Sequence, residues 1–245
     1  MAQISLIPVR TRPFLPPQDS VTDELIKALP PLHEQDVVVV TSKIVAIGQG
    51  RCVPVGSIDK KTLIEREADA LIPGQTSRYD VTLTIKDGTL IASAGIDESN
   101  SQGYYTLWPQ DAAGWARSFC AQLRQARNIS ELAVIVTDSH CTPMRWGVTG
   151  ISIGFHGLQP LRDYRGQQDI FGRPLRFTQS NIVDAIAVAA VSVMGEGDEC
   201  TPVVIVRGWP GLTLTDQDHG QDLTIAREDD IFAPLLVPFV DKTKP

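Results

Sequence analysis

Val37-Val38-Val39-Val40 is an unbroken run of β-branched residues, and Thr41-Ser42-Lys43 follows it directly. An apolar run without alternation is typical of a strand that is buried on both faces of a sheet. Two further runs, 132–136 and 202–206, have the same character. The stretch from 37 to 43 therefore predicts a fully buried strand that ends at a polar turn.

The segments between these runs have the spacing of helices or hairpins. Apolar residues recur every three or four positions in three predicted helices, and a fourth is apolar nearly all round, as a core helix is. These helices cover residues 21–29, 62–71, 111–125 and 182–194. A hairpin is expected from 81–85 and 90–94. Strands and helices alternate, though not strictly, so we assign the chain to the α/β class with mixed α+β character.

The composition is that of a globular enzyme or binding protein. The 245 residues are 42% hydrophobic, and the net charge of −7 argues against nucleic acid as a partner. No apolar run is long enough to span a membrane, and the N-terminus lacks the features of a signal peptide. The four cysteines are widely spaced without a C-x-x-C pair, which favours free thiols in a cytoplasmic protein over structural zinc.

Two aspartates each follow an apolar, strand-like run. Leu90 to Ala94 leads to Asp97, and Leu132 to Val136 leads to Asp138. Two carboxylates brought together at strand ends would repel unless a cation lay between them. Hard oxygen ligands of this kind suit Mg²⁺ or Mn²⁺ beside substrate phosphates. The alternative is that both aspartates are turn or cap residues.

Asp138 opens a polar cluster, Asp138-Ser139-His140-Cys141, which offers four potential ligands or catalytic groups. Consecutive side chains on an extended segment point in opposite directions, so the four cannot converge on one ion. We expect Asp138 and Ser139 to be the ligands of a hard metal, and His140 and Cys141 to take no part in the site. A zinc site and a cysteine nucleophile stay open as alternatives.

The stretch Gly150-Ile151-Ser152-Ile153-Gly154 fits the G-x-S-x-G elbow of serine esterases, and acids and a histidine are available downstream at 216–219. The elbow requires a helix after the serine, whereas two helix breakers occur in the six residues that follow here. Ser152 is therefore expected to be a small residue in a tight strand, with a serine esterase as the less favoured alternative.

Positive charge is concentrated in one stretch of this acidic chain. Five arginines lie in it: Arg145, Arg162, Arg165, Arg173 and Arg176. Because the planar guanidinium suits carboxylates and phosphates, the stretch is either an anion-binding surface or a set of salt bridges to Asp163 and Asp169. Ser42-Lys43 and Gly195-Glu196-Gly197, which directly follow a predicted strand and a predicted helix, are further candidates for phosphate contacts.

A group of stretches between about 37 and 208 carries a family resemblance. They are Thr41 to Val45 with Gly50-Arg51, Ala94 to Asn100, Val136 to Ser139, Pro143 to Gly147, Asp163 to Gly166 with Asp169, Phe171 to Leu175, Val193 to Glu196 and Pro202 to Gly208. The GIDxSN and DYRG…D…GR segments are the most distinctive. In these stretches the chain resembles the coenzyme F420-0:gamma-glutamyl ligase family.

The resemblance implies an α/β-type fold of two interlocked lobes with mixed sheets, and an intertwined homodimer. We expect a single ligase-like domain over 1–245, with lobes of about 1–78 plus 179–245 and about 79–178. The resemblance implies an enzyme that uses GTP and Mg²⁺ or Mn²⁺, with K⁺ as a further candidate ion. In that family GTP activates the carboxylate of coenzyme F420-0 as an acyl phosphate, and L-glutamate then attacks it to form an amide.

The resemblance also implies roles for individual residues. Metal binding is implied for Asp97, Asp138 and Ser139, with Glu196 as a further candidate. Nucleotide contacts are implied for the segment near 7–9 and for Ser42, Lys43, Asn100, Gly195 and Glu196. The candidates for binding the anionic acceptor are Arg145 and Arg165. The expected catalytic residues are Asp97, Asp138 and Arg145.

Several positions depart from the family pattern. The usual Lys-x-Glu-Gly-Arg reads Ile47-Gly48-Gln49-Gly50-Arg51, the usual Gly-Arg-Pro reads Cys141-Thr142-Pro143, and the usual Asp-Glu reads Asp184-Ala185. Because charges are lost, two alternatives are kept. One is a folate or pterin with a glutamate tail as the acceptor, and the other is a non-catalytic nucleotide-binding homologue.

Overall fold

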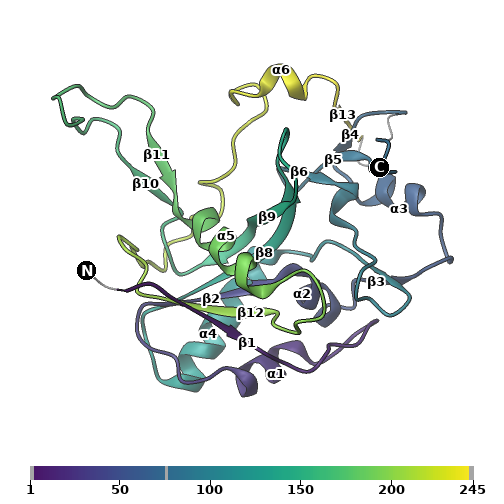
Figure 1. Cartoon of the computed structure of the whole chain (residues 1–245), viewed down its shortest axis with the longest axis horizontal. Coiled ribbons are helices and arrows are strands. Elements are labelled where there is room, and N and C mark those ends of the chain that lie inside the picture. The colour runs from purple at the N-terminus through teal and green to yellow at the C-terminus, as the bar shows by residue number, and fades with distance from the viewer. Residues whose placement is uncertain (1–2, 75–76, 243–245) are drawn as a thin grey trace.

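A five-stranded sheet forms the centre of the protein in a computed structural model that describes residues 3–74 and 77–242 (Figure 1). Its strands, in spatial order, are β1 (Ser5–Val9), β12 (Val203–Arg207), β2 (Asp36–Thr41), β8 (Leu132–Cys141) and β9 (Val148–His156). β2 and β8 run parallel, whereas the other neighbours are antiparallel. The sheet is therefore mixed, and the predicted α/β class is confirmed.

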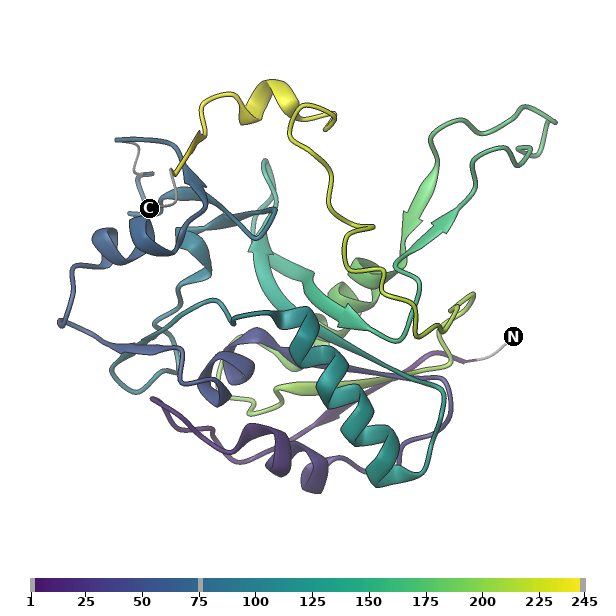
Figure 2. The same cartoon turned by 180° about the vertical axis from the view of Figure 1, so that it is seen from behind.

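Helices cover both faces of this sheet. α1 (Val21–Ala28), α2 (Ser42–Gly48) and α4 (Ala112–Arg127) lie on one face, and α5 (Ile182–Met194) lies on the other (Figure 1 and Figure 2). Val38 and Val40 pack into the core on the α4 side, whereas Val37 and Val39 pack into the core on the α5 side. All four valines are fully buried, so the prediction of a strand buried on both faces is confirmed.

A smaller lobe is built mainly from residues 52–107. It contains β3 (Cys52–Pro54), which pairs with β7 (Tyr104–Thr106), and α3 (Lys60–Glu67). Its four-stranded sheet consists of β13 (Val240–Asp241), β4 (Ala70–Leu71), β5 (Leu83–Lys86) and β6 (Thr89–Ala92). The hairpin predicted near 81–94 is confirmed. The helix expected over 62–71 is shorter, and residues 70–71 form a strand instead because they pair with β5.

These sheets divide the chain differently from the lobe boundaries expected from the sequence. α4, β8 and β9 belong to the central layers although they fall within 79–178, and β4 belongs to the smaller lobe although it falls within 1–78. The difference follows from the parallel pairing of β2 with β8, which brings distant parts of the chain into one sheet.

Two segments extend beyond the packed layers. The first, which we call the arm, is residues 161–181; it begins and ends with β10 (Leu161–Asp163) and β11 (Gln179–Asn181) and projects from the body (Figure 1 and Figure 2). The second is the C-terminal segment 209–242, which includes α6 (Ala233–Leu236) and reaches the smaller lobe, where β13 pairs with β4.

Three predictions from composition can be compared with this fold. All four cysteines are free, as expected. No helix in the described ranges is long and apolar enough to cross a membrane. The core helix predicted at 182–194 is α5.

Candidate functional site

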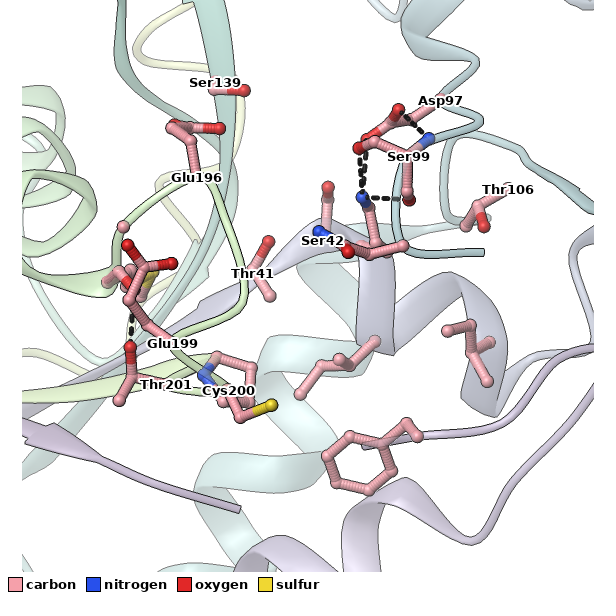
Figure 3. A pocket seen from close by; sticks show the side chains of 18 of the residues that line it. Thr41, Ser42, Asp97, Ser99, Thr106, Ser139, Glu196, Glu199, Cys200 and Thr201 are labelled. Carbon is pink, nitrogen blue, oxygen red and sulfur yellow. Dashed lines mark hydrogen bonds and ion pairs between the residues drawn. The ribbon is translucent and has the colours of Figure 1, made fainter. Parts of the chain in front are cut away.

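A cleft with a volume of about 330 Å³ lies where the smaller lobe meets the central sheet. The lining residues come from six parts of the chain, within 11–14, 41–47, 95–100, 106–107, 137–139 and 191–202. Figure 3 shows Asp97 and Ser99 on one side of the cleft, Glu196 and Glu199 on the other, and Ser42 between them. The cleft therefore joins segments that are far apart in the sequence.

A tight turn brings Asp97 to the cleft. After β6, the 3₁₀ turn η1 (Ser93–Gly95) places three consecutive residues in the left-handed region, with φ of 50°, 55° and 71°. Gly95 lies against the buried ring of Trp108. The backbone of Asp97 then exchanges two hydrogen bonds with Thr106, at 3.0 and 2.8 Å. The position of Asp97 is thus fixed by the backbone on both sides of the residue.

Lys43 is the cationic partner of Asp97. Its Nζ lies 2.6 Å from Asp97 Oδ2 and also donates to the carbonyl oxygen of Ser99 at 2.7 Å and to its hydroxyl at 3.0 Å. Ser99 donates its N–H to Asp97 Oδ1 at 2.8 Å and its hydroxyl to Oδ2 at 3.0 Å. Burial alone would raise the pKa of Asp97, but Lys43 and Ser99 outweigh it and hold the pKa below its ordinary value. Asp97 is therefore ionised at neutral pH.

Asp138 lies within β8, and not beyond its end. The strand continues to Cys141 after a register shift between Val136 and Thr137, so the expectation that Asp138 stands at the end of this strand is wrong. Burial raises the pKa of Asp138 to about 7, although the N–H of Ser139, at 2.7 Å, and the hydroxyl of Ser42 lower it. The charge of Asp97 raises it further. The two aspartates thus line one cleft and interact electrostatically.

The loop after α5 forms the opposite wall. It leaves α5 at Gly195, which has φ of 79° and lies against the carboxylate of Glu199. Glu199 accepts the N–H of Gly197 at 2.8 Å, and the side-chain amide of Asn100 donates to the carbonyl of Gly197 at 2.9 Å. Asn100 therefore connects the smaller lobe with this loop across the cleft.

The cleft is acidic. Among the residues that the structure describes, five carboxylates line it, against one lysine and one arginine; the carboxylates are Asp97, Asp138, Glu196, Asp198 and Glu199. Burial raises the pKa of Glu196, and the charges of Asp97 and Glu199 add to this effect while Lys43 opposes it. The arginine, Arg12, is held in a bidentate ion pair with Asp19, at 2.6 and 2.8 Å. A polyphosphate would therefore be repelled from this cleft unless further cations accompanied it.

Arg145 and Arg165 do not line the cleft of their own chain. Arg145 is exposed in the β8–β9 turn, and Arg165 lies in the arm. Arg165 pairs with Asp163 at 2.6 Å, which is one of the salt bridges that the sequence left open as the alternative. The backbone of Asp169 and its carboxylate shape the tip of the arm, where its side chain accepts the N–H groups of Phe171 and Arg173.

Ser152 is not at a nucleophile elbow. It lies in the middle of β9, opposite Thr137, and its N–H donates to Asp184 at 2.8 Å. Its buried hydroxyl has no hydrogen-bond partner among the described residues. No helix follows the serine directly, so the structure lacks the strand–turn–helix arrangement that an esterase requires.

The glycines of the same motif have a packing role. A Cβ at Gly150 would lie 2.4 Å from the carbonyl oxygen of Ala187 in α5, and a Cβ at Gly154 would lie 2.5 Å from the backbone of Ala112 at the start of α4. The two helices thus approach β9 so closely that only glycine fits. The expectation of a small residue in a tight strand is confirmed.

Ser152→Ala is expected to leave any activity unchanged and to alter the free energy of unfolding by less than about 1 kcal/mol, because only an unpaired hydroxyl is lost. Thermal melts and activity assays on both proteins test this. Covalent labelling of the wild type by a fluorophosphonate, absent in the variant, would contradict it.

Comparison with known proteins identifies the family. A family model described as F420-0:Gamma-glutamyl ligase matches residues 11–208. The chain belongs to this family. A protein named coenzyme F420:L-glutamate ligase from Methanothermobacter thermautotrophicus is 33% identical over 249 residues, which cover 94% of this chain and 98% of that protein. Proteins of the same name from Methanopyrus kandleri and Methanosarcina barkeri are 34% and 30% identical and cover 76% and 83% of this chain, and 79% and 85% of their own.

The cleft of this member of the F420-0:gamma-glutamyl ligase family offers part of a ligand set for a divalent metal. In the described ranges, no three His, Cys, Asp or Glu side chains lie close enough to hold an ion by themselves. Asp97 and Asp138 nevertheless supply two carboxylates, Ser139 supplies a hydroxyl, and Lys43 already places a positive charge on Asp97. Such a set fits Mg²⁺ or Mn²⁺, which bind one or two carboxylates and complete their coordination with water and substrate phosphates.

Some lining residues had no signal in the sequence. The N-terminal residues that line the cleft are Thr11 to Phe14, and the segment near 7–9 does not line it. Thr106 and Cys200 also line the cleft, although neither belongs to a motif that indicates a site. Glu199 could have been found, because it closes an acidic stretch directly after the Gly195-Glu196-Gly197 segment.

Proposed function

We propose that the protein is a ligase that joins L-glutamate, through an amide bond, to the carboxylate of coenzyme F420-0 or a similar cofactor, with GTP and a divalent metal. The names of the aligned relatives support the glutamate and F420 parts of this proposal. One structural observation supports the rest: Asp97 and Asp138, from separate lobes, line the same acidic cleft as Ser42, Lys43 and the loop after α5.

The proposed reaction has two steps. A carboxylate oxygen of the acceptor attacks the γ-phosphorus of GTP, and the bond to the leaving GDP breaks, which gives an acyl phosphate. The amine of glutamate then attacks the acyl carbon and releases a proton, and the bond to phosphate breaks. Neither step needs a nucleophilic side chain, because phosphoryl transfer depends mainly on positioning and on charge neutralisation.

The residues of the cleft suit these needs. When bound, Mg²⁺ or Mn²⁺ would neutralise charge on the phosphate oxygens. Asp97, Asp138 and Ser139 would hold the metal, with Glu196 as a further ligand. Ser42 and Lys43 would contact phosphate oxygens, while Asn100 and Gly195-Glu196 would border the nucleotide. The excess of carboxylates makes binding of the nucleotide depend on the metal.

We further propose that the protein works as a homodimer. The β8–β9 turn and the arm carry large apolar side chains that are almost fully exposed, among them Met144 at 99%, Ile170 at 91% and Phe177 at 89%. Apolar groups so exposed are typical of an interface. The arm is also basic, whereas the cleft is acidic, so a second copy of the chain is the partner of matching charge. In that arrangement Arg145 and Arg165 would reach the acceptor bound in the partner's cleft.

Mixed dimers test this arrangement. Arg165→Ala is expected to raise the KM for the acceptor by about ten-fold or more, because a charge-assisted contact is lost. Subunits carrying Arg165→Ala and subunits carrying Asp138→Asn are then combined. If the arginine acts on the partner's cleft, one site of each mixed dimer has both residues and activity returns. No return of activity would show that Arg165 does not act across the interface.

A GDP-release assay tests the ligase itself. The protein is mixed with GTP, Mn²⁺, L-glutamate and one acceptor, either F420-0 or a folate or pterin that ends in glutamate. Release of GDP together with a product one glutamate heavier is expected with F420-0, and the same result only with the folate or pterin would identify that alternative acceptor. Binding of GTP without release for any acceptor would favour a non-catalytic homologue.

The substituted positions bear on these alternatives. Gln49, where the family usually has glutamate, donates to the carbonyl oxygen of Gln110 at 2.7 Å and accepts its N–H at 2.8 Å. Ile47, which replaces a lysine, is buried. Both replacements are thus accommodated by packing and backbone contacts, and the proposed metal ligands are unaffected. This favours an active ligase over a degenerate homologue.

A further inference from the structure

We propose that Lys43 takes the place of a metal cation: it neutralises Asp97 as long as no metal is bound, and it moves to a phosphate oxygen when metal and nucleotide bind together. The inference rests on the proposed metal and nucleotide site. It goes beyond that site by predicting that the two ligands bind cooperatively.

Three contacts with oxygen atoms hold the ammonium group of Lys43 beside Asp97. A lysine ammonium has three N–H donors. Here they meet Asp97 Oδ2 at 2.6 Å, the carbonyl of Ser99 at 2.7 Å and the hydroxyl of Ser99 at 3.0 Å. The Lys43 side chain is 22% exposed, so the ammonium is held in one place and is not free in solvent. Three oxygen atoms thus surround a positive charge next to the proposed metal ligand.

Lys43 connects the central layers with the smaller lobe. Lys43 comes from the start of α2 in the central layers, whereas Asp97 and Ser99 belong to the turn of the smaller lobe. Lys43 thus links the two lobes at the place where the proposed metal would also link them, through Asp97 of the smaller lobe and Asp138 of the central sheet. Both cations would neutralise the same carboxylate.

Competition between the two cations follows. A metal that approaches Asp97 meets an ammonium already bound to Oδ2, and like charges repel at this distance. Metal alone should therefore bind weakly. A nucleotide phosphate offers Lys43 another anionic partner within the same cleft, so its arrival releases Asp97 for the metal. Metal and nucleotide would then each strengthen the binding of the other by the same factor.

Lys43→Met tests the exchange, because methionine keeps a flexible apolar stem but has no charge. The affinity for Mn²⁺ is measured without nucleotide by electron paramagnetic resonance, and it is expected to rise by about ten-fold once the competing charge is lost. The affinity for GDP at saturating Mn²⁺ is expected to fall by about ten-fold, because a phosphate contact is lost. Lys43→Arg keeps the charge and should leave the Mn²⁺ affinity near that of the wild type.

Lys60→Met is the matched control. Lys60 also pairs with a carboxylate of the smaller lobe, Glu98 at 3.4 Å, but it does not line the cleft. Its loss should change the Mn²⁺ affinity by less than about two-fold, because exposed charges are screened.

An unchanged or lower Mn²⁺ affinity in Lys43→Met would overturn the exchange while leaving the metal site in place. If neither protein bound Mn²⁺, with or without GDP, the proposed metal site and the exchange would both be wrong.

Discussion

Asp138→Asn is expected to abolish amide-bond formation and, at the same time, to make the metal-free protein more stable above pH 7. Asparagine preserves the size of the side chain but cannot supply the negative charge that a divalent metal needs. Turnover should fall by more than about 100-fold. Losing a residue that only supports a metal ligand costs up to about 100-fold, and losing a ligand itself should cost more.

The expected gain in stability comes from the pKa of Asp138. Burial raises that pKa to about 7 in the folded protein, whereas the unfolded value is near 3.8. Between these two values the folded state binds the proton more tightly, so the stability that Asp138 contributes below pH 3.8 is lost as pH rises to 7. A shift of the pKa from 3.8 to about 7 corresponds to about 4 kcal/mol, and solvent screening at this half-buried side chain reduces the cost of the anion above pH 7 to about 2 kcal/mol. Asparagine has no such cost at any pH.

Thermal melts at two pH values measure this effect. At pH 8 without metal, the Tm of Asp138→Asn should exceed that of the wild type by roughly 4–8 °C, and at pH 4 the two should converge. Asp198→Asn is the control, because it removes one negative charge from an exposed side chain of the same cleft. An equal rise in Tm for the control would mean that the net charge, and not burial of Asp138, is responsible. Metal-dependent turnover at the wild-type rate would remove Asp138 from the mechanism.

The sequence predicted the parts of the cleft that have a local signal. Val37 to Val40 is apolar without interruption and residues 182–194 are apolar nearly all round, so their place in the core followed from composition alone. Asp97 and Asp138 stood out because each follows an apolar run. The pattern of apolar and polar residues can be read from a short segment, so these predictions needed no knowledge of long-range contacts.

Other features of the cleft depend on contacts that no short segment specifies. Cys200 and Thr106 reach it only because the smaller lobe packs beside the loop after α5. Residues 70–71 were expected in a helix, and they form a strand because β5 and β13 pair with them on either side. The arginine-rich stretch stood out as a local excess of positive charge. Whether its side chains reach the cleft of the same chain, however, depends on the direction in which the arm projects. That direction is set by how β10 and β11 leave the body.

Gly95→Ala is expected to destabilise the protein more than any other single methyl group added at the site. The φ of Gly95 is 71°, a region that costs an alanine about 1 kcal/mol. Its Cβ would lie 2.1 Å from Cε3 of Trp108 and 2.8 Å from Cζ3. Trp108 is only 2% exposed and has no room to withdraw, so overpacking adds about 1–3 kcal/mol or more. A fall in Tm of roughly 5–15 °C should follow.

The same change should reduce activity beyond what the loss of stability explains, because Gly95 immediately precedes the turn that positions Asp97. Gly103→Ala separates the two causes of destabilisation. Gly103 also has a positive φ, 84°, but a Cβ there would meet nothing within 4 Å, so only the backbone cost of about 1 kcal/mol applies. Gly103→Ala should therefore melt well above Gly95→Ala and keep its affinity for Mn²⁺ in the presence of GDP. Equal melting temperatures would mean that the Trp108 ring can move aside, and that close packing against it does not hold the Asp97 turn in place.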